Sequence, residues 1–313
     1  MLELLLLIVI LLPSAQLGSL NCTLDRPPLQ FHLVRACQRA ATNEALALEN
    51  TSTLEDCMEL ARELRGLALN YAPGGERGGR NLLEQQPQNA DGKGTARRRY
   101  MDARRVLSVF EQPGEYFNCH VLQCPQNVSF AGMTNDSRFD YYSVYGRPTA
   151  LQNVSCVAEV GLFVIFKQPS NYLNASTVCS NSSEFFGSLA HVVSELRTAS
   201  LARLLHSEQL SPLYLAYIGL QYNRSISLQP LDFRNAEQES LLCFLYRAWH
   251  AGYPRISLET NSSCVALTPL GTWQTVNCEH ELPFICEILL PGNTSQHSQL
   301  DVGINSAVEC LHN

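Results

Sequence analysis

The twelve cysteines of this chain could do two kinds of chemistry, because cysteine forms either disulfides or metal sites. Cys119 and Cys124 are separated by four residues, and His120 lies between them. Thiolate and imidazole are good zinc ligands, so this group could hold a metal in a reducing compartment. In an oxidising compartment the same cysteines would be disulfide-bonded. The compartment therefore decides the chemistry.

Two features of the sequence predict that the chain is secreted. Residues Leu4–Leu12 form an unbroken apolar run, and a zone with Ser14, Ala15 and Gly18 follows it. This layout is typical of a signal peptide, which we predict at residues 1–18. In addition, Asn-x-Ser/Thr sequons predict exposed glycosylation sites in a secreted chain. The ten sequon asparagines are Asn21, Asn50, Asn127, Asn135, Asn153, Asn174, Asn181, Asn223, Asn261 and Asn293.

Secretion favours disulfides over metal binding, so we expect no metal site and no cofactor. Leu4–Leu12 is too short for a permanent membrane helix, and no second stretch of membrane length follows. The polar tail at residues 289–313 lacks the hydrophobic end that directs a lipid anchor. We therefore expect an extracellular protein without a membrane span.

The sequence shows no sign of catalysis or of nucleic-acid binding. Gly-x-Ser-x-Gly, His-Glu-x-x-His and Walker patterns are missing, and the eight histidines are scattered. The net charge of −7 is not segregated into a basic region that would attract nucleic acid. We expect no catalytic residues and a function in binding.

A chain of 313 residues is long enough for two domains, each with its own core. Residues 73–105 are rich in Gly, Gln and Arg, which predicts a flexible basic loop inside the first region. Its arginines could bind an acidic glycan or mark a processing site, but a solvated loop is the simpler interpretation.

The first region predicts a helix followed by two strands. Ser52 or Thr53 can cap a helix in which apolar side chains recur on one face, including Cys57. Strands are expected at Leu67–Tyr71 and Phe117–Gln123. This order, with the phrases Thr53–Cys57, Leu69–Tyr71 and Asn118–His120, resembles the PAN/apple module.

The resemblance implies a small α+β module at residues 20–150, with a Cys57–Cys119 disulfide joining helix and sheet. The family usually has a further cysteine in the second half of this helix, where residues 61–65 have none. A second bridge could join Cys124 to either Cys22 or Cys37, and the sequence leaves this choice open.

The second region predicts two helices, one carrying Cys179 and one at Ser194–Leu205, between strands at Gly161–Phe166 and Tyr214–Leu220. Short motifs follow one another in a fixed order through this region. They are Gly187-x-Leu-Ala-x-Val192, Tyr217-Ile-Gly-Leu220, Trp249-x-x-Gly-x-Pro254, Cys264-Val-Ala-Leu267, Gly271-Thr-Trp273, Cys278 and Pro283-Phe-Ile-Cys286. Together they resemble the C-type lectin-like domain, here at residues 156–288.

That resemblance implies a disulfide-stapled α+β fold with two helices, antiparallel sheets and a long loop region before Cys264. It also implies Cys179–Cys286 and Cys264–Cys278 disulfides. Because the two ends of such a fold lie side by side, a Cys156–Cys310 bridge is also expected. Cys243 and an odd number of N-terminal cysteines then remain, and three alternatives are open. Cys243 could form a bridge to the N-terminal module, or an intermolecular disulfide could give a disulfide-linked oligomer. Otherwise an even number of the cysteines forms disulfides within the chain.

The calcium and sugar site of the family is not reproduced. Sugar-binding members carry Glu-Pro-Asn or Gln-Pro-Asp, and an Asn-Asp pair after the Trp. This sequence has Tyr253-Pro254-Arg255 and Trp273-Gln274-Thr275 instead, with Glu259 as a single nearby carboxylate. Calcium takes six to eight oxygen ligands, several of them carboxylate. We therefore expect no calcium-dependent sugar binding.

The same loop region is rich in aromatic residues and arginine, which are enriched in protein interfaces. Trp249, Trp273 and Phe284 match buried positions of the family, so we expect them in the core. The candidate ligand-binding residues are Tyr246, Arg247, Tyr253 and Arg255.

The sequence as a whole predicts a secreted, glycosylated, non-catalytic protein that binds an extracellular protein or glycan, in the extracellular matrix or at an apical surface. The alternative is a carbohydrate-binding lectin of innate defence, which would need calcium ligands elsewhere in the loop.

Overall fold

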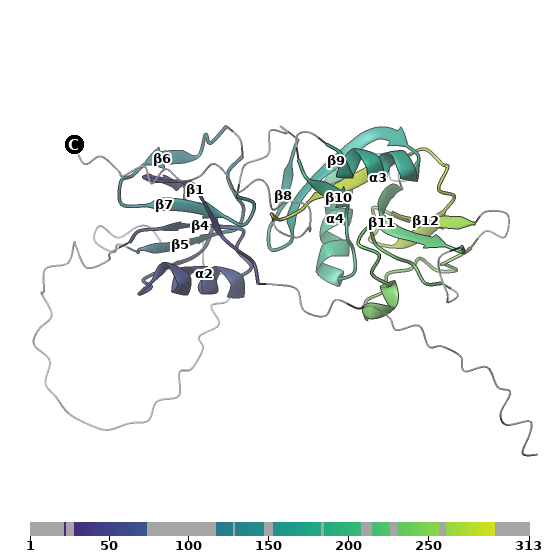
Figure 1. The fold of residues 1–313 in the computed structure, drawn as a ribbon, viewed down its shortest axis with the longest axis horizontal. Coiled ribbons are helices and arrows are strands. Elements are labelled where there is room, and N and C mark those ends of the chain that lie inside the picture. The colour runs from purple at the N-terminus through teal and green to yellow at the C-terminus, as the bar shows by residue number, and fades with distance from the viewer. Residues whose placement is uncertain are drawn as a thin grey trace, which may run out of the picture. The chain divides into compact units, whose positions relative to one another are not determined.

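The structure is a computed structural model (Figure 1) that describes residues 22, 28–73, 117–127, 129–146, 153–182, 185–207, 215–225, 231–256 and 261–291. These residues fall into two compact units, one within Leu29–Pro148 and one within Thr149–Leu289. Cys22 and Pro28 belong to the second unit, and Leu290 and Pro291 to the first. The predicted signal peptide, most of the basic loop, most of the polar tail, Asn21, Asn293 and Cys310 lie outside the described residues.

The first unit is built on a five-stranded antiparallel sheet covered by one helix. The strand order is β1 (His32–Arg35), β7 (Asp140–Ser143), β4 (Ala68–Tyr71), β5 (Cys119–Leu122) and β3 (Ala45–Glu49). Helix α2 (Leu54–Glu63) packs on β4 and β5, along one side of the sheet (Figure 1). A separate pair is formed by β2 (Gln38–Ala40) and β6 (Met133–Asn135).

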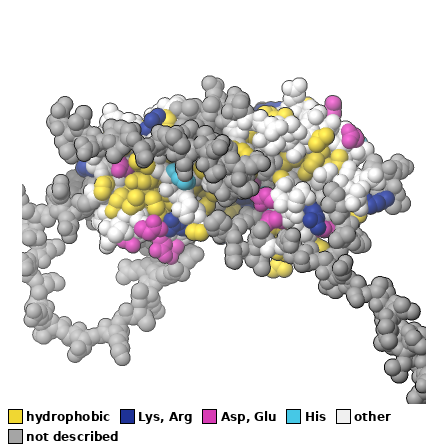
Figure 2. Space-filling model, in the orientation of Figure 1, with side chains coloured by type: hydrophobic (Ala, Val, Ile, Leu, Met, Phe, Trp, Pro, Cys, Tyr) yellow, Lys and Arg dark blue, Asp and Glu magenta, His cyan; other side chains and the backbone are white. Residues whose placement is uncertain are grey.

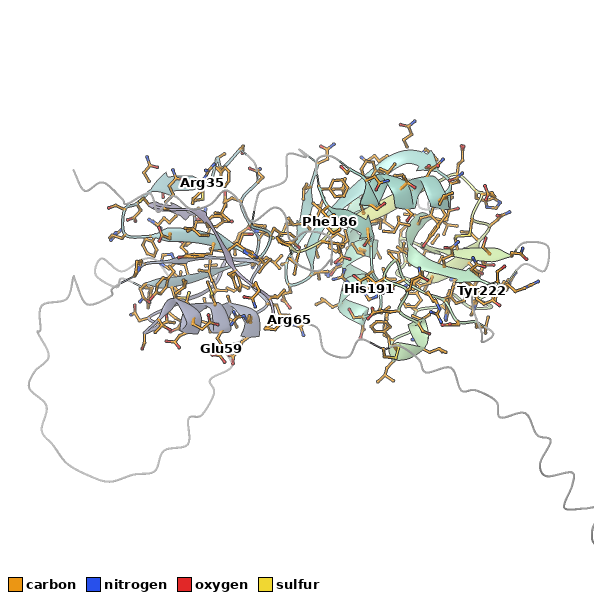
Figure 3. All side chains as sticks on the ribbon, in the orientation of Figure 1. Arg35, Glu59, Arg65, Phe186, His191 and Tyr222 are labelled. Carbon is orange, nitrogen blue, oxygen red and sulfur yellow. A yellow bond between two sulfur atoms is a disulfide. The ribbon has the colours of Figure 1, made fainter. Side chains whose placement is uncertain are left out.

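Helix α2 begins at a capping box, as its sequence predicts. The Thr53 hydroxyl accepts from the Asp56 amide at 3.1 Å, and the Asp56 carboxylate accepts from the Thr53 amide at 2.9 Å. Cys57, Met58 and Ala61 face the sheet, while Glu59 lies on the outward face (Figure 3). The predicted Cys57–Cys119 disulfide is present and joins α2 to strand β5, which lies between β4 and β3, with a Cα–Cα distance of 5.7 Å. The assignment of this unit to the PAN/apple family remains a prediction.

The second unit contains a seven-stranded sheet with the order β13 (Trp273–Val276), β12 (Ser262–Leu267), β11 (Ala216–Asn223), β14 (Leu282–Ile288), β9 (Gly161–Ser170) and β8 (Ser155–Val157). Strand β10 (Gly187–Leu189) pairs with β14. Strands β11 and β14 are parallel, and the other pairs are antiparallel. The predicted helices are α3 (Tyr172–Ser180) and α4 (Glu195–Ser207), and a 3-10 turn, η3, spans Leu241–Cys243.

Two motif glycines allow close backbone contacts in this unit. A Cβ atom at Gly219 would lie 2.5 Å from the Leu189 carbonyl oxygen, and one at Gly187 would lie 2.5 Å from the Glu287 carbonyl oxygen. Any larger residue would therefore push β10 away from β11 and β14. The glycines of both motifs are explained by this packing.

Helix α4 is attached to β14 through a partly buried ion pair. The Arg197 guanidinium is paired with the Glu287 carboxylate, and its Nε donates to the His191 carbonyl at 2.7 Å. The same carboxylate accepts from the His191 amide at 3.1 Å. His191, labelled in Figure 3, thus lies where the chain turns from β10 into α4.

Both disulfides that the lectin-like frame implies are present. Cys179 of α3 bonds to Cys286 of β14, and Cys264 of β12 bonds to Cys278 just after β13. Each such bridge stabilises a fold by roughly 2–4 kcal/mol, mainly by restricting the unfolded chain. They hold the sheet that carries the long loop region, residues 224–261.

Candidate functional site

The long loop region is organised around an aromatic cluster. Trp273 is fully buried, and the rings of Tyr246 and Trp249 pack edge-on against it at centroid distances of 5.6 and 5.5 Å. Phe233 lies 5.1 Å from Trp249. Trp249, Trp273 and Phe284 therefore contribute to the core, as the sequence predicts.

Tyr246 and Arg247 have mainly internal contacts. The Arg247 guanidinium donates to three backbone carbonyls, those of Leu241, Phe244 and Tyr246, at 2.6 to 2.7 Å. Partial burial lowers the pKa of this guanidinium. Arg247 thus braces its own loop, and a role of either residue in ligand binding stays a prediction.

Tyr253 and Arg255 form a stacked pair beside Pro254. The Arg255 guanidinium carbon lies 5.0 Å from the centroid of the Tyr253 ring, and its Nε donates to the Gly252 carbonyl at 2.9 Å. His250 packs edge-on against the same ring at 6.0 Å. The Tyr253–Pro254 peptide is cis. Arg255 is exposed and Tyr253 is half-buried, so both are accessible to a partner.

Thr275 fixes the position of Arg255 through two hydrogen bonds. Its hydroxyl accepts from the Arg255 amide at 2.8 Å and donates to the Arg255 carbonyl at 2.6 Å. Thr275 belongs to β13, so the stacked pair is attached to the edge strand of the sheet. No local sequence signal predicts this contact, because the two partners lie 20 positions apart in the chain.

The residues at this place do not fit calcium. Arg255 brings a positive charge, and the hydroxyl of Thr275 is engaged by the backbone of Arg255. Glu259 lies outside the described residues. In the part of the chain that the structure describes, no group of three or more His, Cys, Asp or Glu residues is placed to hold a metal ion.

A disulfide attaches the N-terminal segment to the loop region. Cys22 bonds to Cys243 of η3, with a Cα–Cα distance of 5.4 Å. The sequence left the partner of Cys243 open. In the structure this partner is Cys22 of the same chain, and not a cysteine of a second chain. This bond also removes Cys22 as a partner of Cys124. Cys37, Cys124 and Cys156 are disulfide-bonded as well.

The described surface carries mixed charge. On the face shown in Figure 2, the basic and acidic side chains of the described residues are interspersed. Among those residues no helix is both long and apolar enough to cross a membrane.

Residues 168–288 match the family model of the Lectin C-type domain. The second unit is therefore a C-type lectin-like domain, as its motifs predict. Domains of this family generally act by binding and not by catalysis, so a binding function follows from the fold.

The chain is also similar to solved C-type lectin structures. Human lithostathine is 18% identical, covers 44% of this chain and 98% of its own, and has a TM-score of 0.36. The lectin CEL-I from Cucumaria echinata is 16% identical, with coverage of 45% and 98% and a TM-score of 0.37. The carbohydrate-recognition domain of mouse scavenger receptor C-type lectin is 16% identical, with coverage of 44% and 96% and a TM-score of 0.36. A search of curated proteins returned no match.

Proposed function

We propose that this protein is a secreted, glycosylated, non-catalytic binding protein whose lectin-like domain recognises an extracellular protein or glycan without calcium. The observation that carries the proposal is the stacked Tyr253–Arg255 pair, held by Thr275 at the positions where sugar-binding relatives place calcium ligands. The extracellular matrix or an apical surface is the proposed location.

Electrostatics argue against calcium at this place. A divalent cation near the Arg255 guanidinium would be repelled unless several carboxylates offset the charge. Gln274 and Thr275 are neutral, and the Thr275 hydroxyl already accepts a hydrogen bond from the Arg255 amide. A partner that brings negative or aromatic groups would instead be attracted to Arg255.

The geometry of the pair suits a binding contact. Arg255 is braced by Gly252 and by the Tyr253 ring, so little conformational entropy would be lost when a partner binds. Arginine and tyrosine are frequent hot-spot residues because they combine a large contact area with directed hydrogen bonds. We expect Tyr253 and Arg255 to contribute most of the binding energy in this loop.

The exposure of the sequons supports glycosylation. Seven of the predicted acceptor asparagines are exposed, and an eighth, Asn223, is half-buried. The exposed seven are Asn50, Asn127, Asn135, Asn153, Asn174, Asn181 and Asn261. A bulky glycan could be accommodated at each without disturbing the core.

A binding screen of the secreted protein tests the proposal. The full chain is applied to arrays of glycans and of extracellular proteins, with calcium and with EGTA. We expect a ligand whose binding is unchanged by EGTA and falls roughly tenfold or more in Arg255→Ala. Arg203→Ala, an exposed arginine of α4, is the matched control and should bind as the parent protein does.

The alternative is a calcium-dependent, carbohydrate-binding lectin of innate defence. It would be supported if array binding were restricted to glycans, were abolished by EGTA and were indifferent to Arg255→Ala. That result would overturn the calcium-independent proposal.

A further inference from the structure

A polar pocket of about 270 Å³ lies on the lectin-like unit, apart from Tyr253 and Arg255. Its walls come from α3, β10, β11 and the loop at residues 234–238. Serine hydroxyls line one side, from Ser176, Ser180 and Ser188. Carboxamides line the other, including Gln221 and Asn223. Such a lining is suited to a ligand with several hydroxyl groups, that is, to a sugar.

The pocket has firm walls. Tyr172 is buried and packs edge-on against Tyr217 at a centroid distance of 5.3 Å. On the opposite wall, Asn235 is buried and donates to the Glu239 carboxylate at 2.9 Å. Arg234 pairs with Asp232 at 2.8 Å, and its backbone exchanges hydrogen bonds with that of Gln221 at 2.8 and 2.9 Å. A pocket built this way does not depend on a ligand for its shape.

Asn223 is both a lining residue of this pocket and the acceptor of a sequon, Asn223-Arg224-Ser225. It is the last residue of β11 and, unlike the other described sequon asparagines, is half-buried. Its side-chain oxygen accepts from the Ser225 amide at 2.9 Å. This contact occupies the carbonyl oxygen and leaves the amide nitrogen, to which an N-linked sugar is attached, for the sugar.

We propose that the pocket receives the first N-acetylhexosamine of the glycan attached to Asn223 of the same chain. The proposal rests on the glycosylation that the proposed function includes. The sugar hydroxyls would bond to the serine and carboxamide groups, and the acetamide methyl would contact Tyr172 or Leu189. Pockets for small molecules begin at about 300 Å³, and the volume of this pocket is close to that limit. A pocket of this size suits one sugar ring and excludes a long oligosaccharide.

Asn261 provides a matched control. Strands β11 and β12 place Asn223 opposite Ser262, and the Arg224 amide donates to the Asn261 carbonyl at 2.8 Å. The two sequons therefore lie at the same end of the sheet. Asn261 is exposed and does not line the pocket, so its glycan should extend into solvent.

The experiment measures glycan release from the native secreted protein by an amidase that cleaves the asparagine–sugar bond. Site occupancy and release rates at Asn223 and Asn261 are followed by mass spectrometry of glycopeptides. We expect both sites to be occupied and release at Asn223 to be at least tenfold slower. Ser188→Val narrows the pocket and removes one of its hydroxyls without changing a sequon, and it should raise the release rate at Asn223 toward that at Asn261. Gln238→Ala, at an exposed lining position, gives the same test if Ser188→Val is not secreted.

The outcomes separate the two proposals. If no sequon of the protein carries a glycan, the glycosylation in the proposed function is wrong; if other sequons are occupied and neither of these two is, the pocket proposal alone is wrong. If Asn261 is occupied and Asn223 is empty, or if both glycans are released at equal rates, the pocket proposal is wrong while glycosylation of the protein stands.

Discussion

At the scale of single residues, Tyr217 shows how the lectin-like unit departs from the family pattern without losing the fold. It stands where related domains have a tryptophan, and it is fully buried. Its single hydroxyl proton is shared between the carbonyls of His280 at 2.8 Å and Asn277 at 3.0 Å. The phenol thereby ties β11 to the segment that links β13 to β14. Burial raises the pKa of Tyr217 above its ordinary value, so the hydroxyl keeps its proton.

Tyr217→Phe should therefore destabilise the lectin-like unit. The change removes only the hydroxyl and takes away the donor to the His280 carbonyl, which costs about 1–3 kcal/mol, while the Asn277 carbonyl still accepts from the His280 amide. Tyr222→Phe is the control on the same strand, because the Tyr222 hydroxyl makes no hydrogen bond to the described residues (Tyr222 is labelled in Figure 3). Denaturant unfolding of both variants measures the difference, and equal loss in both would contradict this role of Tyr217.

Asp136 makes the stability of the first unit depend on pH. The Arg138 guanidinium, bonded to both carboxylate oxygens at 2.7 and 2.8 Å, lowers the pKa of Asp136, and Arg39 contributes from 3.1 Å. A lowered folded-state pKa means that the carboxylate stabilises the fold above the unfolded pKa, about 4. This contribution is lost as the pH falls through the folded pKa.

We expect Asp136→Asn to be less stable than the parent protein at pH 7 and to approach it in stability below about pH 3. The variant keeps the Asn135 sequon, so glycosylation does not confound the comparison. Thermal unfolding across this pH range measures the effect. A difference that is constant with pH would show that ionisation of Asp136 is not involved.

At the scale of elements, the first turn of α2 depends on its cap. Thr53→Ala removes the acceptor for the Asp56 amide and should cost about 1 kcal/mol of stability. Thr53→Ser keeps the hydroxyl and should retain nearly full stability. Neither change touches the Asn50 sequon, which ends at Ser52. Chemical denaturation distinguishes the two variants, and equal stability would argue against the cap.

The α-helices of the described residues and four of the strands, β4, β5, β9 and β11, could be predicted from the sequence because their signals are local. Thr53, Asp56 and the apolar face of α2 lie within one short segment, and the motifs of the lectin-like domain follow in a fixed order. The contacts inside the loop region could not be predicted in this way. The hydrogen bonds between Thr275 and Arg255, and the carbonyl contacts of Arg247, depend on how the loop folds back on the sheet.

At the scale of the whole molecule, the Cys22–Cys243 bond argues against one expectation from the cysteine count. Cys243 has its partner within the same chain, so a disulfide-linked oligomer does not follow from this residue. The bond also holds Cys22 against η3.

We expect non-reducing peptide mapping to recover a Cys22–Cys243 linked peptide from monomeric protein. Replacing both cysteines by serine should lower the melting temperature, because the bond that closes a loop over a sequence separation of 221 is lost. The oligomeric state of the variant should remain monomeric. Recovery of Cys243 in a bond between two chains would contradict the structure.

Binding without calcium is the central claim for the whole molecule, and it can be tested most directly by isothermal titration of calcium into the purified secreted protein. Arg255 and the engaged hydroxyl of Thr275 predict no saturable heat, and an affinity for the partner that is equal in calcium and in EGTA. Stoichiometric calcium binding, with loss of the partner in EGTA, would contradict it.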